Sequence, residues 1–273
     1  MTEFQVLGIT LKDYSVRESM RKVETYLNDG KVSAICYITA GGILEAESHP
    51  ETRAFLEDMD LTIPADTDIL KTVGITARYR FREVAGNDFL RLFLQKVSKN
   101  GDGVVLLSDT SENTDKLEKS ISDRDSGIKI VGKFALNDLK NDEEGLINDI
   151  NVLAPTVIIS TLSYPDREEF FKEHHMKLHA EVWLILPGNM IFTDKKPGIA
   201  GRIKAFFENK ALKKTLDQYN REEESAEESA KDEALKGTEE GVKQPEGEKI
   251  REFLKFNTQE IDTDKVNKAV END

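Results

Sequence analysis

Short apolar runs alternate along this chain with longer segments whose apolar residues recur at helical spacing, and this alternation constrains the fold more than any other feature. Apolar strands this short, separated by helices of about ten to fifteen residues, are what a parallel sheet covered on both faces requires. The sequence therefore predicts an open, Rossmann-like α/β fold with a mostly parallel sheet and helices on both faces. The predicted strands are residues 4–9, 33–39, 61–64, 104–107, 128–131, 156–162 and 182–186.

The predicted helices fill the intervals between these strands. Val16, Met20, Val23 and Leu27 recur at helical spacing and the pattern closes at Gly30, which is typical of a helix end. We expect Gly101-Asp102-Gly103 to be a helix-to-strand turn. The other predicted helices run to about residue 58, over 86–99, to about 122, over 139–153 and onward from 166.

Charge separates the end of the chain from its body. Residues 221–273 hold nine basic and 17 acidic residues, a net charge of −8 out of −14 for the whole chain. The large apolar residues of 221–249 are Leu235 and Val242 alone, too few to offset the entropy of ordering, so we predict a disordered acidic tail. Within this tail, residues 250–273 form either one short amphipathic helix or a frayed chain end.

Composition also indicates where the protein works. A pI near 4.9 disfavours nucleic acid as a partner, because such binding depends on basic residues that meet phosphates. The first residues lack a basic segment followed by a long apolar run, and no apolar stretch is long enough to span a bilayer. The single cysteine, Cys36, fits a reducing compartment. We therefore expect a cytoplasmic protein.

Ligands of open α/β sheets bind beyond the carboxyl ends of the strands, so the residues that follow each strand are the informative ones. Thr39, Gly41 and Gly42 follow the second strand, where they form either a tight turn or a helix start that accepts a phosphate. Asp66 and Asp68 follow the third, where a carboxylate either caps the next helix or acts as a general base.

Later strand ends add a cation and a second glycine turn. Arg167, followed by Glu168, opens a helix and either clamps a diphosphate or lies solvated on the surface. Gly188 and Asn189 follow the last strand, where they form a plain turn or contact a ligand closely. We predict no metal site, because the three histidines that lie close together in the sequence, His174, His175 and His179, have no matching carboxylate or cysteine cluster.

Five motifs in the first 216 residues, taken with their order and spacing, resemble those of the WecG/TagA/CpsF glycosyltransferases. That family has Thr-Ala-Asn-Pro-Glu, Asp-Leu-Val-Ile-Pro, Val-Ala-Gly-x-Asp and Pro-Lys-Gln-Glu in this order. The segments that correspond to these four motifs are Thr39-Ala40, Asp60-Leu61-Thr62-Ile63-Pro64, Val84-Ala85-Gly86-Asn87-Asp88 and Pro165-Asp166-Arg167-Glu168, and Lys129-Ile130-Val131-Gly132 is a fifth segment that resembles the family.

The resemblance implies transfer of a sugar from a UDP-sugar, of the UDP-N-acetylhexosamine type, to a polyprenyl-diphosphate-linked acceptor in polysaccharide biosynthesis. Asp66 would be the catalytic base, with Asp68 as substitute, and Thr39 would help to position the substrate. No cofactor is implied if the protein's own groups stabilise the departing diphosphate. The implied substrate-binding residues are Gly41, Gly42, Gly86, Asp88, Arg167, Glu168, Gly188 and Asn189.

Several family positions differ in this chain. Ala65-Asp66 stands where the family has Asp-Gly, Gly41-Gly42 where it has Asn-Pro, and Arg167 where it has Gln. These departures leave open a second function from a different class, a non-catalytic nucleotide-sugar sensor or scaffold in a polysaccharide-assembly complex. A homo-oligomer also remains open.

A basic segment follows the last predicted strand. Residues 195–214 contain seven basic residues and one acidic residue, with apolar residues interleaved at helical spacing. Such a segment either packs on the body or binds anionic lipid headgroups, and the lipid-linked acceptor favours the inner face of the cell membrane. Its predicted membrane contacts are Lys204, Lys210, Lys213 and Lys214. The predicted units are thus an α/β domain (1–194), a basic amphipathic segment (195–220) and the acidic tail (221–273).

Overall fold

A computed structural model of the chain describes residues 2–7, 9–139 and 142–191, and it contains the predicted parallel sheet. Six strands lie in the order β4-β3-β8-β7-β5-β6, and every neighbouring pair is parallel. All six carboxyl ends therefore lie at one edge of the sheet. The strands are β3 (Ser33–Ile38), β4 (Leu61–Pro64), β5 (Gly103–Ser108), β6 (Lys129–Ala135), β7 (Val157–Ser160) and β8 (Val182–Ile185).

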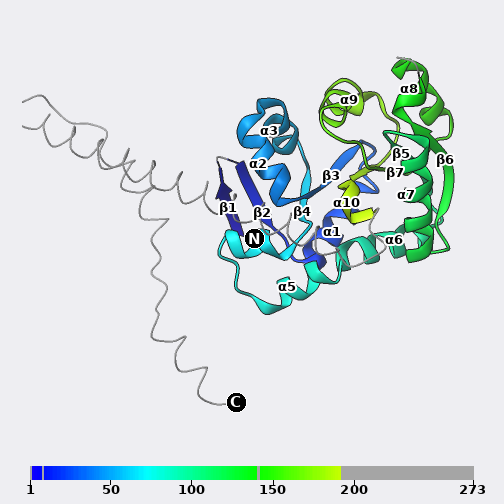
Figure 1. Cartoon of the computed structure of the whole chain (residues 1–273). Coiled ribbons are helices and arrows are strands. Elements are labelled where there is room, and N and C mark those ends of the chain that lie inside the picture. The colour runs from blue at the N-terminus through cyan, green and yellow to red at the C-terminus, as the bar shows by residue number, and fades with distance from the viewer. Residues whose placement is uncertain (1, 8, 140–141, 192–273) are drawn as a thin grey trace, which may run out of the picture. The chain divides into compact units, whose positions relative to one another are not determined.

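Helices cover both faces of this sheet, which confirms the predicted α/β architecture (Figure 1). One face packs against α2 (Ala40–Ser48), α3 (Pro50–Glu57), α8 (Glu143–Val152) and α9 (Asp166–His174). The other face packs against α1 (Val16–Tyr26), α6 (Asp88–Asn100) and α7 (Ser111–Arg124). The other helical elements of the described residues are α4 (Thr67–Thr72), α5 (Arg78–Ala85), α10 (Gly188–Ile191) and the 3₁₀ turns η1 (Leu136–Leu139) and η2 (His175–Lys177).

The central strands send alternate side chains into the two cores. In β3, Cys36 and Ile38 face the layer of α2 and α9, whereas Ile35 and Tyr37 face the layer of α1 and α6. Trp183 of β8 is fully buried in the first core, and its indole N–H donates to Ser160 Oγ at 2.8 Å. Because strands in the middle of a covered sheet are buried on both faces, they read as continuous apolar runs in the sequence.

The first predicted strand, residues 4–9, is wrong as a single strand. It is split between β1 (Thr2–Val6) and β2 (Ile9–Asp13), which pair antiparallel in a separate two-stranded sheet. Val6 is the partner of Ile9, and Leu7 has a φ of 52°, so the chain reverses inside the predicted strand. Tight hairpin turns often require a positive φ, which leucine rarely adopts. The leucine therefore gave no sign of a turn in the sequence, and the apolar run was interpreted as one strand.

The single helix predicted up to about residue 58 is also wrong, because it is two helices. α2 ends at Ser48 and α3 begins at Pro50, with His49 between them in an extended conformation. Proline disfavours helical backbone at the residue before it and is well placed at the first helical position. The predicted turn at Gly101-Asp102-Gly103 is confirmed: Gly101 caps α6 with a left-handed φ of 75° and β5 starts at Gly103.

The basic segment 195–220 and the acidic tail 221–273 lie outside the described residues, so the predictions made for them stand as predictions. Among residues 2–7, 9–139 and 142–191, no helix is long and apolar enough to cross a membrane.

Candidate functional site

The predicted site residues of β3 and β4 meet at the carboxyl edge of the sheet. Ile38, at the end of β3, is paired with Pro64, at the end of β4, and Ala65 N–H donates to Ile38 O at 2.8 Å. Thr39 and Asp66 follow directly, one on each strand. The parallel register therefore places the Thr39 and Asp66 segments side by side at the edge where ligands of such sheets bind.

Thr39 and the paired glycines form the start of α2. Thr39 is the N-cap, and its Oγ1 accepts a hydrogen bond from Gly42 N–H at 3.0 Å. Gly41 and Gly42 thus belong to the first helical turn rather than to a loop. The helix start that the sequence left open as one of two alternatives is therefore present, and the positive end of the α2 dipole lies at the carboxyl edge of the sheet.

Asp66 is the N-cap of α4, so the capping role that the sequence left open is confirmed. Its Oδ1 accepts from the amide groups of Asp68 at 3.0 Å and Ile69 at 3.1 Å. Burial raises the pKa of the Asp66 carboxyl, and hydrogen bonds from the amides of Ile69, Asp68 and Ala40 act in the opposite direction. The Ala40 contact joins Asp66 to the first residue of α2.

Asp68, the predicted substitute, points to a different neighbour. Its carboxylate forms an ion pair with Lys71 Nζ at 2.7 Å on the surface of α4. A surface pair between residues three apart contributes little to stability.

Gly86 and Asp88 belong to another part of the surface. Gly86 ends α5, and Asp88 lies in the first turn of α6, where it pairs with Arg91 at 3.0 Å. Asp88 lines a groove between α1 and α6 together with Arg17 and Arg21. The structure thus does not bring these two residues into the set of contacts that joins Thr39 and Asp66.

Arg167 is held by carboxylates on the α2 side of the sheet. Its Nη2 contacts Glu168 Oε1 and lies 3.8 Å from Glu45 Oε2 of α2, and its guanidinium stands 4.8 Å from the centre of the Phe55 ring. Glu45 follows Ala40 by five residues, a rise of about 7.5 Å along a helix. Helix α2 therefore connects the Asp66 contact at its first residue with Arg167 further along.

The last predicted pair lies at the end of β8. Gly188 begins α10, and Leu186 N–H donates to Ser160 O at 2.8 Å, which ties this strand end to β7. The backbone of Asn189 lies within α10, and its side chain is outside the described part of the structure.

Sequence reasoning missed two clusters of charged residues. Arg80 is 2% exposed and is buried between Asp13 of β2 and Glu83 of α5, with its Nε 3.1 Å from Asp13 Oδ1. No pattern in the sequence distinguishes Arg80 from the neighbouring exposed Arg78 and Arg82, because the partner Asp13 is distant in the chain.

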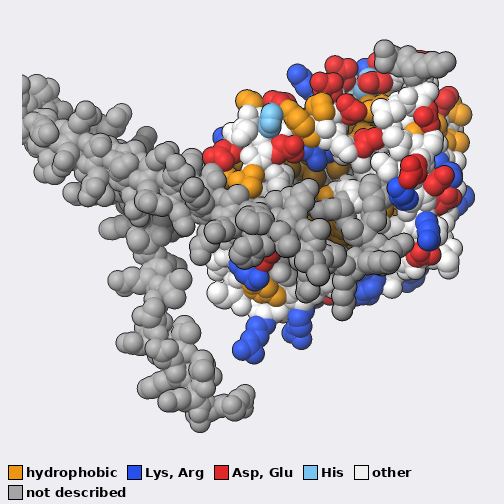
Figure 2. All heavy atoms as spheres, viewed as in Figure 1, with side chains coloured by type: hydrophobic (Ala, Val, Ile, Leu, Met, Phe, Trp, Pro, Cys, Tyr) orange, Lys and Arg blue, Asp and Glu red, His pale blue; other side chains and the backbone are white. Residues whose placement is uncertain are grey.

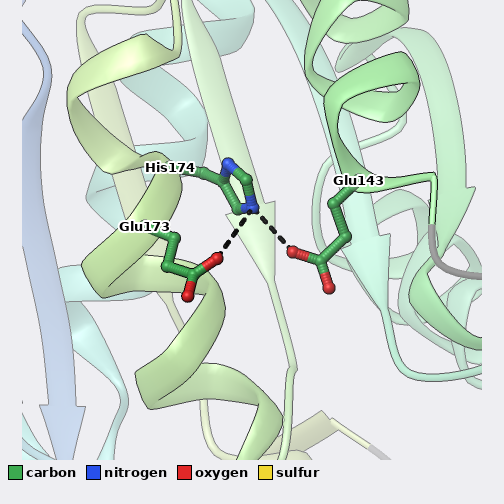
Figure 3. Close-up of side chains that lie close together, drawn as sticks. All are labelled: Glu143, Glu173 and His174. Atoms are coloured by element: carbon green, nitrogen blue, oxygen red, sulfur yellow. Dashed lines mark hydrogen bonds and ion pairs between the residues drawn. The ribbon is translucent and has the colours of Figure 1, made fainter.

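The second cluster surrounds His174, for which the sequence offered no matching carboxylate (Figure 3). Glu143 of α8 supplies one: its Oε2 lies 2.6 Å from His174 Nε2, and Glu173 Oε2 lies 3.9 Å away. The donor types suit a divalent cation. However, Lys177 Nζ lies 3.5 Å from His174 Nδ1, so both ring nitrogens have protein partners. A histidine that donates from Nε2 and accepts at Nδ1 accounts for this geometry without a metal.

Comparison with protein families gives a match. The model of the family described as "Glycosyl transferase WecG/TagA/CpsF family" matches residues 4–193, about two thirds of the chain. A search of curated proteins finds none that matches. The matched range contains the whole parallel sheet and the Thr39, Asp66 and Arg167 segments. The chain belongs to the WecG/TagA/CpsF glycosyltransferase family.

Proposed function

We propose that this glycosyltransferase-family protein binds a UDP-sugar of the UDP-N-acetylhexosamine type. It transfers the sugar, with inversion, to a polyprenyl-diphosphate-linked acceptor at the inner face of the cell membrane during cell-surface polysaccharide synthesis. The observation that carries the proposal is the desolvated carboxyl of Asp66 at the carboxyl edge of the sheet, in contact with the first residue of α2. This combination sets a proton acceptor beside a helix start that suits a phosphate group.

In this proposal Asp66 takes the proton of the acceptor hydroxyl while that oxygen attacks the anomeric carbon of the donor. The bond between the anomeric carbon and the diphosphate oxygen breaks, and UDP leaves with the electron pair. A raised pKa makes the Asp66 carboxylate a stronger base than an ordinary aspartate, which supports this role. Asp68 is the alternative base.

The charge of the departing diphosphate needs stabilisation, and the chain's own groups are proposed to provide it. The positive end of the α2 dipole lies beside Thr39, and the Gly188 backbone lies at the end of β8. Arg167 adds a cation if the diphosphate takes the place of Glu45, the more distant of its two carboxylate partners. No metal or other cofactor is part of the proposal.

Two contacts favour the alternative, a non-catalytic nucleotide-sugar sensor or scaffold. Asp66 Oδ1 already accepts two backbone amides as a helix cap, which leaves that oxygen less available to a proton. Arg167 already contacts Glu168 and Glu45, and a diphosphate would compete with both. In a family member that kept the fold and lost catalytic activity, we expect the polar side chains of the former site to bond to other groups of the protein in this way.

Titration of the full chain with UDP and UDP-N-acetylhexosamines, followed by a transfer assay on a lipid-diphosphate-sugar acceptor, separates these functions. The enzyme predicts saturable UDP binding and transfer to the acceptor. If UDP binds but no sugar is transferred from any donor, the enzymatic function is refuted and the sensor function is supported. Absence of binding by UDP and every UDP-sugar would leave only a scaffold.

A further inference from the structure

A small cavity lies next to the carboxyl ends of β3 and β4, on the face of the sheet that α1 and α6 cover. Its walls come from α1, the two strand ends, α5 and the start of α6, and none of its lining residues has a role in the proposed reaction. Its volume of about 20 Å³ is enough for one buried water, which needs roughly 10–15 Å³, and is too small for an organic ligand. The size of the cavity thus limits its occupant to one water or a single ion.

Two buried hydroxyl groups that line the cavity have no hydrogen-bond partner among the residues that the structure describes. Ser19 of α1 is 1% exposed and Tyr37 of β3 is 5% exposed, and neither Ser19 Oγ nor the Tyr37 hydroxyl is bonded. A buried hydroxyl without a partner is unfavourable, so each of these groups requires an atom that donates or accepts a hydrogen bond. The two hydroxyls come from different elements, and each indicates independently that the cavity has a polar occupant.

The Tyr37 hydroxyl keeps its hydrogen at physiological pH. Burial raises its pKa, and the Leu90 amide lies near enough to lower it, although this amide does not meet the geometry of a hydrogen bond. A phenol oxygen that accepts from this amide would still have its own hydrogen to donate. Tyr37 is therefore a buried donor that needs an acceptor.

The charged groups beside the cavity are already paired with one another. Arg80 is 2% exposed, donates from Nε to Asp13 at 3.1 Å and contacts Glu83. Its neighbours Arg78 and Arg82 are exposed instead, and Figure 2 shows basic side chains that project into solvent in this part of the surface, below α5. Because Arg80 would repel a bound cation and Glu83 a bound anion, the geometry favours a neutral occupant.

We propose that the cavity holds one ordered water that bridges Ser19 Oγ and the Tyr37 hydroxyl. A water molecule has two hydrogens to donate and also accepts hydrogen bonds, so it can satisfy both hydroxyls at once. Asn87 also lines the cavity and offers a third polar group. The bridge joins α1 to β3 just before Thr39, so it fixes a helix to the strand end that carries the proposed site.

Urea unfolding of the full-length chain, in a double-mutant cycle, tests the bridge. Ser19→Ala and Tyr37→Phe should each raise the unfolding equilibrium constant about fivefold, the effect of one lost hydrogen bond. The double variant should be only slightly less stable than either single variant, because the first substitution already breaks the bridge. Hydroxyls without a water predict the opposite sign. Removal of an unsatisfied buried group would leave the constant unchanged or lower it, and this result would overturn the proposal.

Matched controls correct for effects that do not involve the cavity. Ser122→Ala, at an exposed position within α7, measures the higher helix propensity of alanine. Tyr79→Phe, at an exposed position on α5, measures the loss of a tyrosine hydroxyl in contact with solvent. If the losses in Ser19→Ala and Tyr37→Phe are additive after this correction, each hydroxyl has a partner of its own and the shared water is refuted.

A crystal structure of the full-length chain supplies the direct test, and it decides the proposal even if a variant fails to fold. We expect a solvent peak about 2.7–3.0 Å from both hydroxyl oxygens in the wild type, and none bridging them in Tyr37→Phe. The proposal fails if the peak contacts only one of the two hydroxyls. It also fails if Ser19 Oγ donates to the Ser15 carbonyl, with no solvent peak in a map that resolves other buried waters.

Discussion

At the scale of single residues, Asp66 combines two roles that one substitution can separate. Asparagine caps a helix about as well as aspartate, because its side-chain oxygen accepts the same amide hydrogen bonds, but it cannot take a proton. We expect Asp66→Asn to keep the free energy of unfolding within about 0.5 kcal/mol and to lower the transfer rate by roughly 100-fold or more. Single-turnover transfer assays and urea unfolding check the two parts.

Asp66→Ala is the matched variant. It loses both the proton acceptor and the cap, so it should be as inactive as Asp66→Asn and less stable by about 1 kcal/mol. Full transfer activity in Asp66→Asn would contradict its role as the base.

Arg167 and Glu168 make a second residue-scale prediction. Arg167→Ala leaves Glu168, which is almost fully buried, without its cation, and removal of one member of a buried pair is strongly destabilising. Because Arg167 retains 18% side-chain exposure and solvent screens part of the charge, we expect a loss of about 2 kcal/mol rather than more. Chemical unfolding of Arg167→Ala and of Arg167→Ala/Glu168→Gln measures it.

The double variant removes the buried charge and should recover about half of that loss. UDP affinity should fall in Arg167→Ala if the guanidinium contacts the diphosphate, and it should stay low in the double variant. Equal stability of the two variants would show that Glu168 does not depend on Arg167.

Part of the candidate site was predictable from the sequence. The positions of Thr39 and Asp66 follow from the rule that ligands meet parallel sheets beyond the carboxyl ends, and the cap at Asp66 follows from helix-start signals. The Arg80 cluster and the pairing of His174 with Glu143 depend on side chains distant in the chain. A single sequence with no observable covariation carries no local signal for such contacts.

At the scale of elements, the apolar runs predicted the six strands of the parallel sheet because both faces of that sheet are covered. Two local features opposed the pattern: a leucine in a left-handed conformation inside the first run, and a helix break at Pro50. Pro50 was a usable signal, since the residue before proline disfavours helix. Leu7 was not, because its type predicts the opposite conformation.

The end of α6 supplies an element-scale test. Gly101 has a φ of 75°, and a Cβ added there would meet nothing within 4 Å, so strain of the backbone alone opposes substitution. We expect Gly101→Ala to lower the free energy of unfolding by about 1 kcal/mol. Gly101→Asn should lose less, because asparagine tolerates this conformation. Urea unfolding compares the two, and equal losses would contradict the backbone explanation.

At the scale of the whole molecule, the basic residues of 195–214 predict reversible binding to anionic liposomes. The attraction weakens as salt shortens the Debye length, so binding should decrease between low and physiological ionic strength. Replacement of Lys204, Lys210, Lys213 and Lys214 by glutamate should abolish it. Vesicle sedimentation measures binding, neutral vesicles are the control, and wild-type protein that ignores anionic vesicles at low salt would refute the prediction.

The acidic tail makes a separate whole-molecule prediction. Residues 221–273 contain too little apolar surface to contribute much to the core, so their removal should leave the melting temperature of the body within about 5 °C of the full chain. Differential scanning calorimetry of the chain ending at residue 220 tests this. A larger decrease would show that the tail packs on the body.

The strand order β4-β3-β8-β7-β5-β6 has a consequence for how the chain reaches this fold. One edge of β3 pairs with β4, which follows it closely in the chain. Its other edge pairs with β8, as in the pairing of Ser33 with Val182, so this edge stays open until β8 has been synthesised. Pairings between segments so far apart form slowly, because the chain must close a long loop before it gains the contacts. On the ribosome, β3–β4 and β5–β6–β7 would therefore emerge as two partial sheets with open edges, and β8 would join them in the final step.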